Sequence, residues 1–300
     1  MDDFTTAFAT AEFETDETTI FVRRGGAADG PPILLLHGFP QTHLMWRHVA
    51  PRLARHFTVV CADLRGYGRS GCPASTDDHA PYAKRAMARD MVDVMACLGF
   101  SRFAVVGHDR GGRVAYRLAL DHPDRVTRCA VLDIVPTAAA WERADDRFAV
   151  GYWPWSLLAQ PEPLPERLIA GAADAIVDDA LGKWGSPASA FPADVRDAYV
   201  NALADPVHAH AICEEYRAAA TLDRAHDDED RAVGRRITCP LLVLWSAHGP
   251  LSMWYAAESG PLALWRPLSA DVQGHAIDGG HFFPEDAPEE TSAALMRFLG

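Results

Sequence analysis

The stretch 107–112, Gly-His-Asp-Arg-Gly-Gly, places a carboxylate between glycines two positions before it and two positions after it. This spacing is typical of a nucleophile elbow, a sharp strand-to-helix turn that holds one side chain at the carboxyl end of a sheet. Asp109 would be that side chain. A carboxylate needs no base to deprotonate it, and it can displace a leaving group from an sp3 carbon to form an ester. The alternative is that Asp109 only caps the helix that follows.

An aspartyl ester must then be hydrolysed, which requires a base that activates water and a second carboxylate that orients the base. His281, in a Gly-Gly-His loop after the last expected strand, is the candidate base. The loop at 246–251 contains no carboxylate, so Asp133, after the strand that follows the elbow, is the candidate orienting acid. Taken alone, His281 would be an ordinary loop histidine. We expect Asp109, Asp133 and His281 to act together because all three follow strands.

A short apolar run at 33–36 ends in His37-Gly38-Phe39-Pro40. A loop at that point can supply a backbone N–H that faces the elbow, which is one half of an oxyanion hole. We expect the N–H groups of Phe39 and Arg110 to be the two donors. A plain turn is the alternative for this loop.

Two arginines, Arg110 and Arg113, follow Asp109 at one and four positions. Because they are three residues apart at the start of a helix, both side chains can point toward one pocket. Two guanidinium groups beside a helix N-terminus form a site for a small carboxylate. Such a pair would align the α-carbon of a substrate with Asp109 for in-line displacement. Surface salt bridges are the alternative for either arginine.

Apolar runs that indicate buried strands alternate with helical patterns on both sides of the elbow. This alternation predicts an α/β protein with a mostly parallel, doubly wound sheet that binds ligands at the carboxyl ends of its strands. From Thr137 to about Ala225 the alternation stops. We therefore expect a core domain of residues 1–136 and 226–300, and a helical cap subdomain of residues 137–225 that roofs the site. The acidic run at 226–230 is expected to be solvated and to mark the exit from the cap.

The composition argues against several classes of function. A formal net charge of −13 disfavours nucleic acid as a partner, because phosphate binding requires a concentrated basic face. With no signal-peptide pattern and no run of about 18 apolar residues, we expect neither secretion nor a membrane partner. Six scattered cysteines without a Cys-x-x-Cys pair indicate a reduced, cytoplasmic protein. His208 and His210 have no evident third ligand, so we expect a surface or helix position for them and no metal site.

Five stretches carry a resemblance to a known family, namely residues 37–42, 63–68, 107–114, 132–137 and 279–283. Over nearly its whole length the chain resembles the α/β-hydrolase superfamily, and specifically the haloacetate (fluoroacetate) dehalogenases. The specific element is His-Asp-Arg-Gly-x-Arg, since related haloalkane dehalogenases and epoxide hydrolases usually have Trp after the nucleophile. The resemblance implies an α/β-hydrolase fold and a cofactor-free hydrolase that converts a small 2-halocarboxylate to the 2-hydroxy acid. It also suggests a homodimer.

The expected cap contains one departure from the family. The resemblance implies that Trp155 and Tyr216 hold the leaving halide together with the histidine of a Tyr-x-His-Trp pattern. In this chain the pattern reads Tyr152-Trp153-Pro154-Trp155, with Pro154 in the place of the histidine. Proline donates no hydrogen bond. Since fluoride is the poorest halide leaving group, we predict that C–F cleavage is weak, while chloroacetate and bromoacetate remain candidate substrates.

Two further functions remain open. An epoxide hydrolase would use the same Asp, His and Asp but would open its ring with cap tyrosines, for which Tyr216 with Tyr152 or Tyr199 could serve. That function leaves the two arginines without a role. A non-catalytic receptor for a small ligand would have no use for a base that activates water.

Overall fold

The computed structural model describes residues 3–300. Within these residues one eight-stranded sheet has the order β1-β2-β4-β3-β5-β6-β7-β8. β2 pairs antiparallel with both β1 and β4, and every other pair is parallel, which confirms the mostly parallel sheet. The strand bounds are β1 (Ala9–Glu14), β2 (Thr19–Gly26), β3 (Pro32–Leu36), β4 (Thr58–Ala62), β5 (Phe103–His108), β6 (Val126–Leu132), β7 (Leu241–Ser246) and β8 (Val272–Ile277).

The central strands are buried on both faces because helices cover the two sides of the sheet. In β3, Leu34 and Leu36 face one hydrophobic cluster, whereas Ile33 and Leu35 face another. The first cluster includes the methionines of α3 (Lys84–Cys97) and the apolar face of α4 (Asp109–Asp121). The second includes residues of α2 (Ala50–Leu53) and α15 (Pro288–Leu299). The alternation of period two along β3 therefore divides the core into two layers.

The chain changes direction across the sheet at β3. It passes from β3 to β4 on one side and then returns to place β5 on the other side of β3. Ligands of open α/β sheets bind at such a switch point, outside the carboxyl ends of the strands. The loops after β3 and β5, which hold Phe39 and Asp109, meet at this position.

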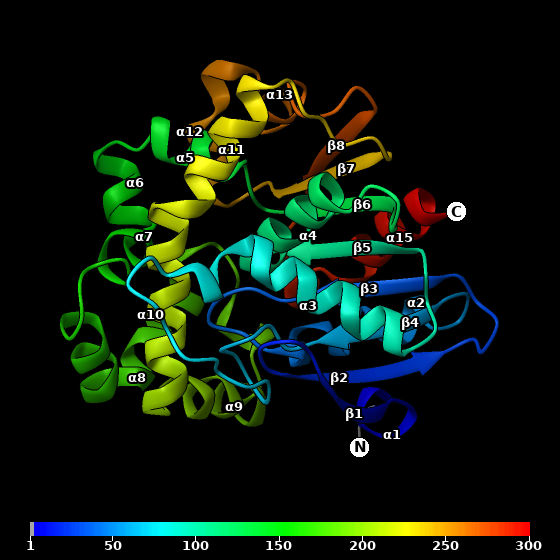
Figure 1. Ribbon diagram of the computed structural model, residues 1–300, viewed down its shortest axis with the longest axis horizontal. Coiled ribbons are helices and arrows are strands. Elements are labelled where there is room, and N and C mark those ends of the chain that lie inside the picture. Colours follow the sequence, from blue (N-terminus) through cyan, green and yellow to red (C-terminus); the bar gives the residue numbers. More distant parts are fainter. Residues whose placement is uncertain (1–2) are drawn as a thin grey trace.

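Between β6 and β7 the described chain is helical. In Figure 1 the helices from α6 to α10 lie to one side of the sheet, beyond the carboxyl ends of the parallel strands. The helices of this region are α5 (Thr137–Glu142), α6 (Asp146–Gly151), α7 (Trp153–Leu157), α8 (Leu164–Lys183), α9 (Ala193–Ala204), α10 (Pro206–Ala220) and α11 (Leu222–Ala232). The predicted cap boundary after residue 225 lies inside α11, so the division into 137–225 and core stays a prediction.

The prediction that the acidic run 226–230 is solvated holds for Asp228 and Glu229, which are exposed, and was wrong for Asp227 and Asp230. Asp227 and Asp230 are buried in α11, where both accept hydrogen bonds from Arg117 of α4. Asp227 also accepts from the hydroxyl of Tyr116. Pairing with buried donors outweighs the tendency of an acidic run to remain in water.

Shorter helices complete the described chain: α1 (Asp3–Ala7), η1 (His43–Arg47), η2 (Ala80–Tyr82), η3 (Ala188–Ala190), α12 (Pro250–Trp254), η4 (Ala256–Glu258), α13 (Leu262–Trp265) and α14 (Phe283–Asp286). No helix of residues 3–300 is long and apolar enough to cross a membrane. Over the same residues, no three His, Cys, Asp or Glu side chains are grouped to hold a metal ion.

Candidate active site

Asp109 begins α4 directly after β5, at a turn with a φ of 44°. A left-handed conformation is unfavourable for a residue with a Cβ atom and is retained where the surrounding structure fixes it. Here the surroundings need glycine, because a Cβ atom on Gly107 would collide with the carbonyl of Gly111. The N-cap of α4 is His108. Asp109 is therefore the first residue of the helix and not its N-cap, which was the alternative interpretation.

The Asp109 carboxylate lies against the loop after β3. Its Oδ2 accepts a hydrogen bond of 3.0 Å from the backbone N–H of Phe39. A side chain at Gly38 would collide with this carboxylate. Arg110 is in the first turn of α4, where backbone N–H groups have no partner within the helix. Both N–H groups expected in the oxyanion hole are thus next to the nucleophile candidate.

The charges around Asp109 keep it ionised. Burial alone would raise the pKa of its carboxyl, but the nearby charges of His281, Arg110, His108 and Arg113 outweigh burial and hold the pKa below its usual value. An ionised carboxylate at neutral pH is the form that acts as a nucleophile.

His281 and Asp133 are in direct contact. His281 Nδ1 lies 2.5 Å from Asp133 Oδ2, and both side chains are buried. Asp133 has a φ of 52° at the end of β6, and its other oxygen accepts from the backbone N–H of Ser246 at 2.8 Å. This arrangement leaves His281 Nε2 as the free ring nitrogen, because the carboxylate fixes the proton on Nδ1.

The backbone of His281 is also fixed on both sides. Its N–H donates to the carbonyl of Trp184 at 2.7 Å, and its carbonyl lies 2.8 Å from His108 Nε2. Burial lowers the pKa of His108 to about 3, so this ring is neutral and donates from Nε2. Neither Trp184 nor His108 was predicted to have such a role, since only the fold brings these segments together.

Arg113 is a buried guanidinium without a carboxylate partner among the described residues. Its Nη1 donates to the carbonyl of Val135 and to Thr137 Oγ1, each at 3.1 Å. Its buried Nε has no hydrogen-bond partner. Burial and the charge of Arg110 lower its pKa, although a guanidinium remains charged. An uncompensated buried charge is costly, and an anion bound beside it would remove that cost.

Arg110 has a different environment from Arg113. Its Nε donates to Glu215 Oε1 and Oε2 at 2.9 and 2.8 Å, and its Nη2 donates to Oε1 at 2.5 Å. Its Nη1 is buried and has no partner. The sequence motifs pointed to Tyr216 but not to Glu215, its neighbour on α10. A buried carboxylate could have been expected near the site, because two arginines that both point inward need a negative charge to balance them.

The predicted halide-binding residues lie against the two arginines. The Cζ of Arg113 is 4.3 Å from the ring centroid of Trp155, and the Cζ of Arg110 is 4.0 Å from that of Tyr216. Both aromatic side chains are buried. Burial raises the pKa of Tyr216, so its hydroxyl keeps its proton and can donate. Pro154 is buried in the first turn of α7 and adds no hydrogen-bond donor to the predicted halide-binding residues Trp155 and Tyr216.

The two other cap tyrosines differ in position. Tyr152 has a buried hydroxyl with no hydrogen-bond partner among residues 3–300, and its ring centroid is 6.1 Å from that of His281. Tyr199 instead donates to Glu285 Oε1 at 3.2 Å, in a buried group that also contains Arg47. Only Tyr152 remains available for the epoxide-opening role considered for either residue.

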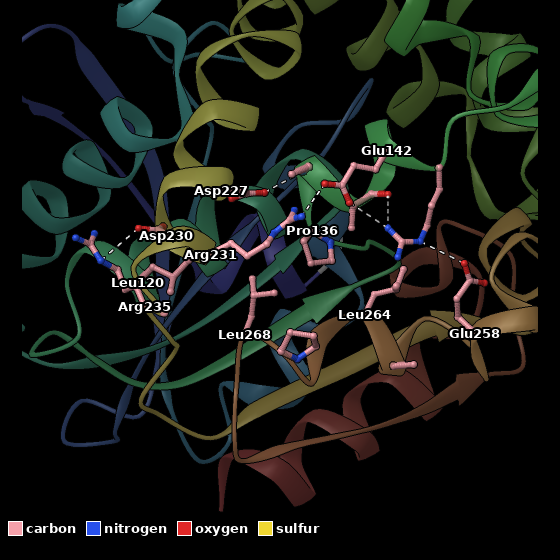
Figure 2. A pocket seen from close by; sticks show the side chains of 16 residues that line it. Leu120, Pro136, Glu142, Asp227, Asp230, Arg231, Arg235, Glu258, Leu264 and Leu268 are labelled. Carbon is pink, nitrogen blue, oxygen red and sulfur yellow. Dashed lines mark hydrogen bonds and ion pairs between the residues drawn. The ribbon is translucent and has the colours of Figure 1, made fainter.

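A separate cavity of about 480 Å³ lies between α5, α11 and α13. Figure 2 shows that apolar side chains, among them Pro136, Leu264 and Leu268, line it together with ion-paired side chains such as Arg231 and Glu142. None of the predicted catalytic or substrate-binding residues lines it. One of its lining residues, Asp227, is connected to Arg113 through the hydroxyls of Tyr116 and Thr137.

Comparison with known proteins agrees with this architecture. The α/β-hydrolase fold family matches residues 31–288. A fluoroacetate dehalogenase of Burkholderia sp is 43% identical over 95% of this chain and 92% of its own length. A soluble epoxide hydrolase of Corynebacterium sp. (strain C12) is 28% identical over 91% of both chains. A crystal structure described as an α/β hydrolase of Nostoc sp PCC 7120 superimposes with a TM-score of 0.93, at 47% identity over 98% of both chains. The chain therefore belongs to the α/β-hydrolase fold family and, within it, to the family of the Burkholderia fluoroacetate dehalogenase.

Proposed function

We propose that this protein hydrolyses the carbon–halogen bond of a small 2-halocarboxylate and releases the 2-hydroxy acid and halide. The observation that carries this proposal is the buried guanidinium of Arg113, which forms no ion pair with a carboxylate of residues 3–300 and lies close to the ionised Asp109. A substrate carboxylate would supply the missing negative charge. The 43% identity to a fluoroacetate dehalogenase supports the same class of reaction.

In the first step the substrate carboxylate binds Arg113 and the free Nη1 of Arg110. This contact directs the α-carbon toward Asp109. An oxygen of Asp109 attacks that carbon in line, a C–O bond forms, and the carbon–halogen bond breaks with its electron pair on the halide. Trp155 Nε1 and the Tyr216 hydroxyl donate to the departing halide. The product is an alkyl ester of Asp109.

In the second step water hydrolyses the ester. His281 Nε2 accepts a proton from the water, and the oxygen attacks the carbonyl carbon of the ester. The N–H groups of Phe39 and Arg110 stabilise the resulting oxyanion, while Asp133 stabilises the imidazolium. Collapse of this intermediate passes the proton from His281 to the departing alkoxide of the hydroxy acid and leaves Asp109 as a carboxylic acid that carries one oxygen and the second proton of the water. Ionisation of this carboxyl releases the proton and regenerates the Asp109 carboxylate.

The halide preference follows from the donors in the cap. With Pro154 in place of a donor, two donors hold the leaving group. Removing one stabilising contact from a dry site can cost roughly 3 kcal/mol, about a hundredfold in rate. Fluoride depends most on such contacts, so we propose that C–F cleavage is weak and that chloroacetate and bromoacetate react faster.

The test is halide release from fluoroacetate, chloroacetate and bromoacetate, with Asp109→Ala as the control. Release that requires Asp109 supports the proposal. Halide release that persists in Asp109→Ala would contradict the proposed mechanism. Equal rates for fluoroacetate and chloroacetate would contradict the proposed halide preference.

Epoxide hydrolysis is the second candidate because of one observation. The Tyr152 hydroxyl is buried without a partner, and burial raises the pKa of both Tyr152 and Tyr216, so both are protonated donors for an epoxide oxygen. Styrene oxide turnover that is lost in Tyr152→Phe, without halide release from any haloacetate, would favour this function.

We further propose that the protein acts in the cytoplasm as a homodimer. The six cysteines form no disulfide, which suits a reducing compartment. Sedimentation equilibrium of the purified protein tests the dimer directly.

A further inference from the structure

A buried carboxylate and a buried ammonium lie behind the Arg110 guanidinium. Glu215 of α10 accepts three hydrogen bonds from Arg110, and it also contacts Lys84 Nζ of α3. Lys84 Nζ is in turn 3.3 Å from Asp223 Oδ2 of α11. The Tyr67 hydroxyl donates to Glu215 Oε2 at 3.3 Å. Every member of this group is buried.

The charges in this group are balanced. Burial lowers the pKa of Lys84 to about 7, so below that pH two positive groups, Arg110 and Lys84, oppose two negative groups, Glu215 and Asp223. Without Lys84, Glu215 would direct its whole charge at Arg110 and would largely cancel the attraction of Arg110 for an anion. With Lys84 in contact, that charge is shared between two cations. The Arg110 guanidinium then keeps a net positive field at its free Nη1.

We propose that Glu215 and Lys84 are positioning residues that set the affinity of the site for the substrate carboxylate. Glu215 fixes the guanidinium of Arg110 with Nη1 free, and Lys84 keeps Glu215 from neutralising it. Neither residue touches the substrate. This inference rests on the proposed function, since it assigns the substrate charge to the site formed by Arg110 and Arg113.

The position of Lys84 is unusual for this chain. The sequence has two lysines, and the other, Lys183, is exposed on α8 in an ion pair with Asp179. A buried lysine is costly unless its charge is used or paired. Lys183 therefore supplies a matched control, because its replacement removes the same charge at a distance from the arginines.

The experiment is done at pH 6, where Lys84 is charged, and measures the binding of acetate, which has the carboxylate but no leaving group, and of neutral acetamide. Both are followed by ligand-observed NMR on the methyl signal with the full chain. The variants are Lys84→Met, Glu215→Gln, the double variant, and Lys183→Met as the control. We expect Lys84→Met to weaken acetate binding about tenfold, which corresponds to about 1.4 kcal/mol. Glu215→Gln should strengthen acetate binding, and the double variant should lie within about threefold of the unaltered protein. Acetamide binding should change in none of them.

The proposal predicts that the two single variants change acetate affinity in opposite directions, whereas a purely structural role would lower it in both. Loss of acetate affinity in both Lys84→Met and Glu215→Gln, or equal losses for acetate and acetamide, would overturn it. Unchanged acetate binding in Lys84→Met would also overturn it. If the unaltered protein releases no halide while the two variants still change acetate affinity in opposite directions, the proposed reaction is wrong and the anion-binding site is supported. If chloroacetate is turned over but the two variants do not change acetate affinity in opposite directions, only this inference is wrong.

Discussion

Replacing Arg113 with methionine should separate activity from stability. In the free protein this guanidinium is buried without an ion pair to any carboxylate in the described part of the chain, and its hydrogen bonds go to the carbonyl of Val135 and the hydroxyl of Thr137. Losing these two bonds costs about 1 kcal/mol each. Burial of this guanidinium is costly, and its attraction to the Asp109 carboxylate offsets that cost only in part. Replacing buried ions by apolar groups of similar volume is often neutral or stabilising by about 1–4 kcal/mol. We therefore expect Arg113→Met to unfold at the same or a higher urea concentration.

The same variant should lose turnover of chloroacetate. Truncating one member of a buried, hydrogen-bonded charge pair costs about 2–5 kcal/mol, and the substrate carboxylate is the other member here. We expect kcat/KM to fall by about two to three orders of magnitude, at about 1.4 kcal/mol for each tenfold change.

Arg110→Met is the matched comparison, since it leaves Glu215 buried with Lys84 as its remaining cationic partner. Breaking a buried pair by removing one partner costs about 3–5 kcal/mol, so this variant should be clearly less stable. Urea denaturation of both variants, with kcat/KM for chloroacetate, forms the assay. The reasoning is refuted if Arg113→Met is destabilised as much as Arg110→Met, or if it retains full turnover of chloroacetate.

Three further predictions concern the leaving group and pH. Pro154→His should raise fluoride release from fluoroacetate by about a hundredfold relative to chloride release, because it adds a donor to the cap; an unchanged ratio in a halide electrode assay would argue against the assignment of Trp155 and Tyr216 as halide-binding residues. Because the charges of His281 and Arg110 hold the pKa of Asp109 below its usual value, alkylation of Asp109 in rapid-quench experiments should not vary between about pH 5 and 8; a rate that rises across this range would mean that Asp109 is protonated. Burial lowers the pKa of His108 from 6.5 to about 3, so between these values the unfolded chain binds a proton that the folded chain does not. His108 should therefore make the protein less stable as pH falls from 7 to 4, by up to about 1.4 kcal/mol per pH unit, and His108→Gln should reduce the slope of urea stability against pH.

The fold and the elbow could be predicted from local patterns. Buried apolar runs and glycine spacing are properties of a few neighbouring residues, so the strand ends at Asp109 and Asp133 follow from short stretches of sequence. The division of the core into two layers also follows from the alternation within strands such as β3.

The polar partners of the site could not be predicted in the same way. Glu215 is 105 residues from Arg110, and their contact depends on how α10 packs against α4. The acidic run of α11 looks solvated in sequence, yet Asp227 and Asp230 pair with Arg117 and are buried. Tyr199 looks like a cap tyrosine but donates to Glu285. In each case a long-range ion pair or hydrogen bond decides the position of a side chain whose local sequence gives no indication of it.

The central claim is that Asp109 becomes alkylated by the substrate. The most direct test incubates His281→Gln, which lacks the base for ester hydrolysis, with chloroacetate and measures the mass of the intact protein and of its peptides. Asp109→Asn serves as the control for alkylation of cysteines. We predict a mass increase of about 58 Da, one carboxymethyl group, on the peptide that contains Asp109 and its absence from the control. An unmodified Asp109 in a variant that still releases chloride would contradict the account.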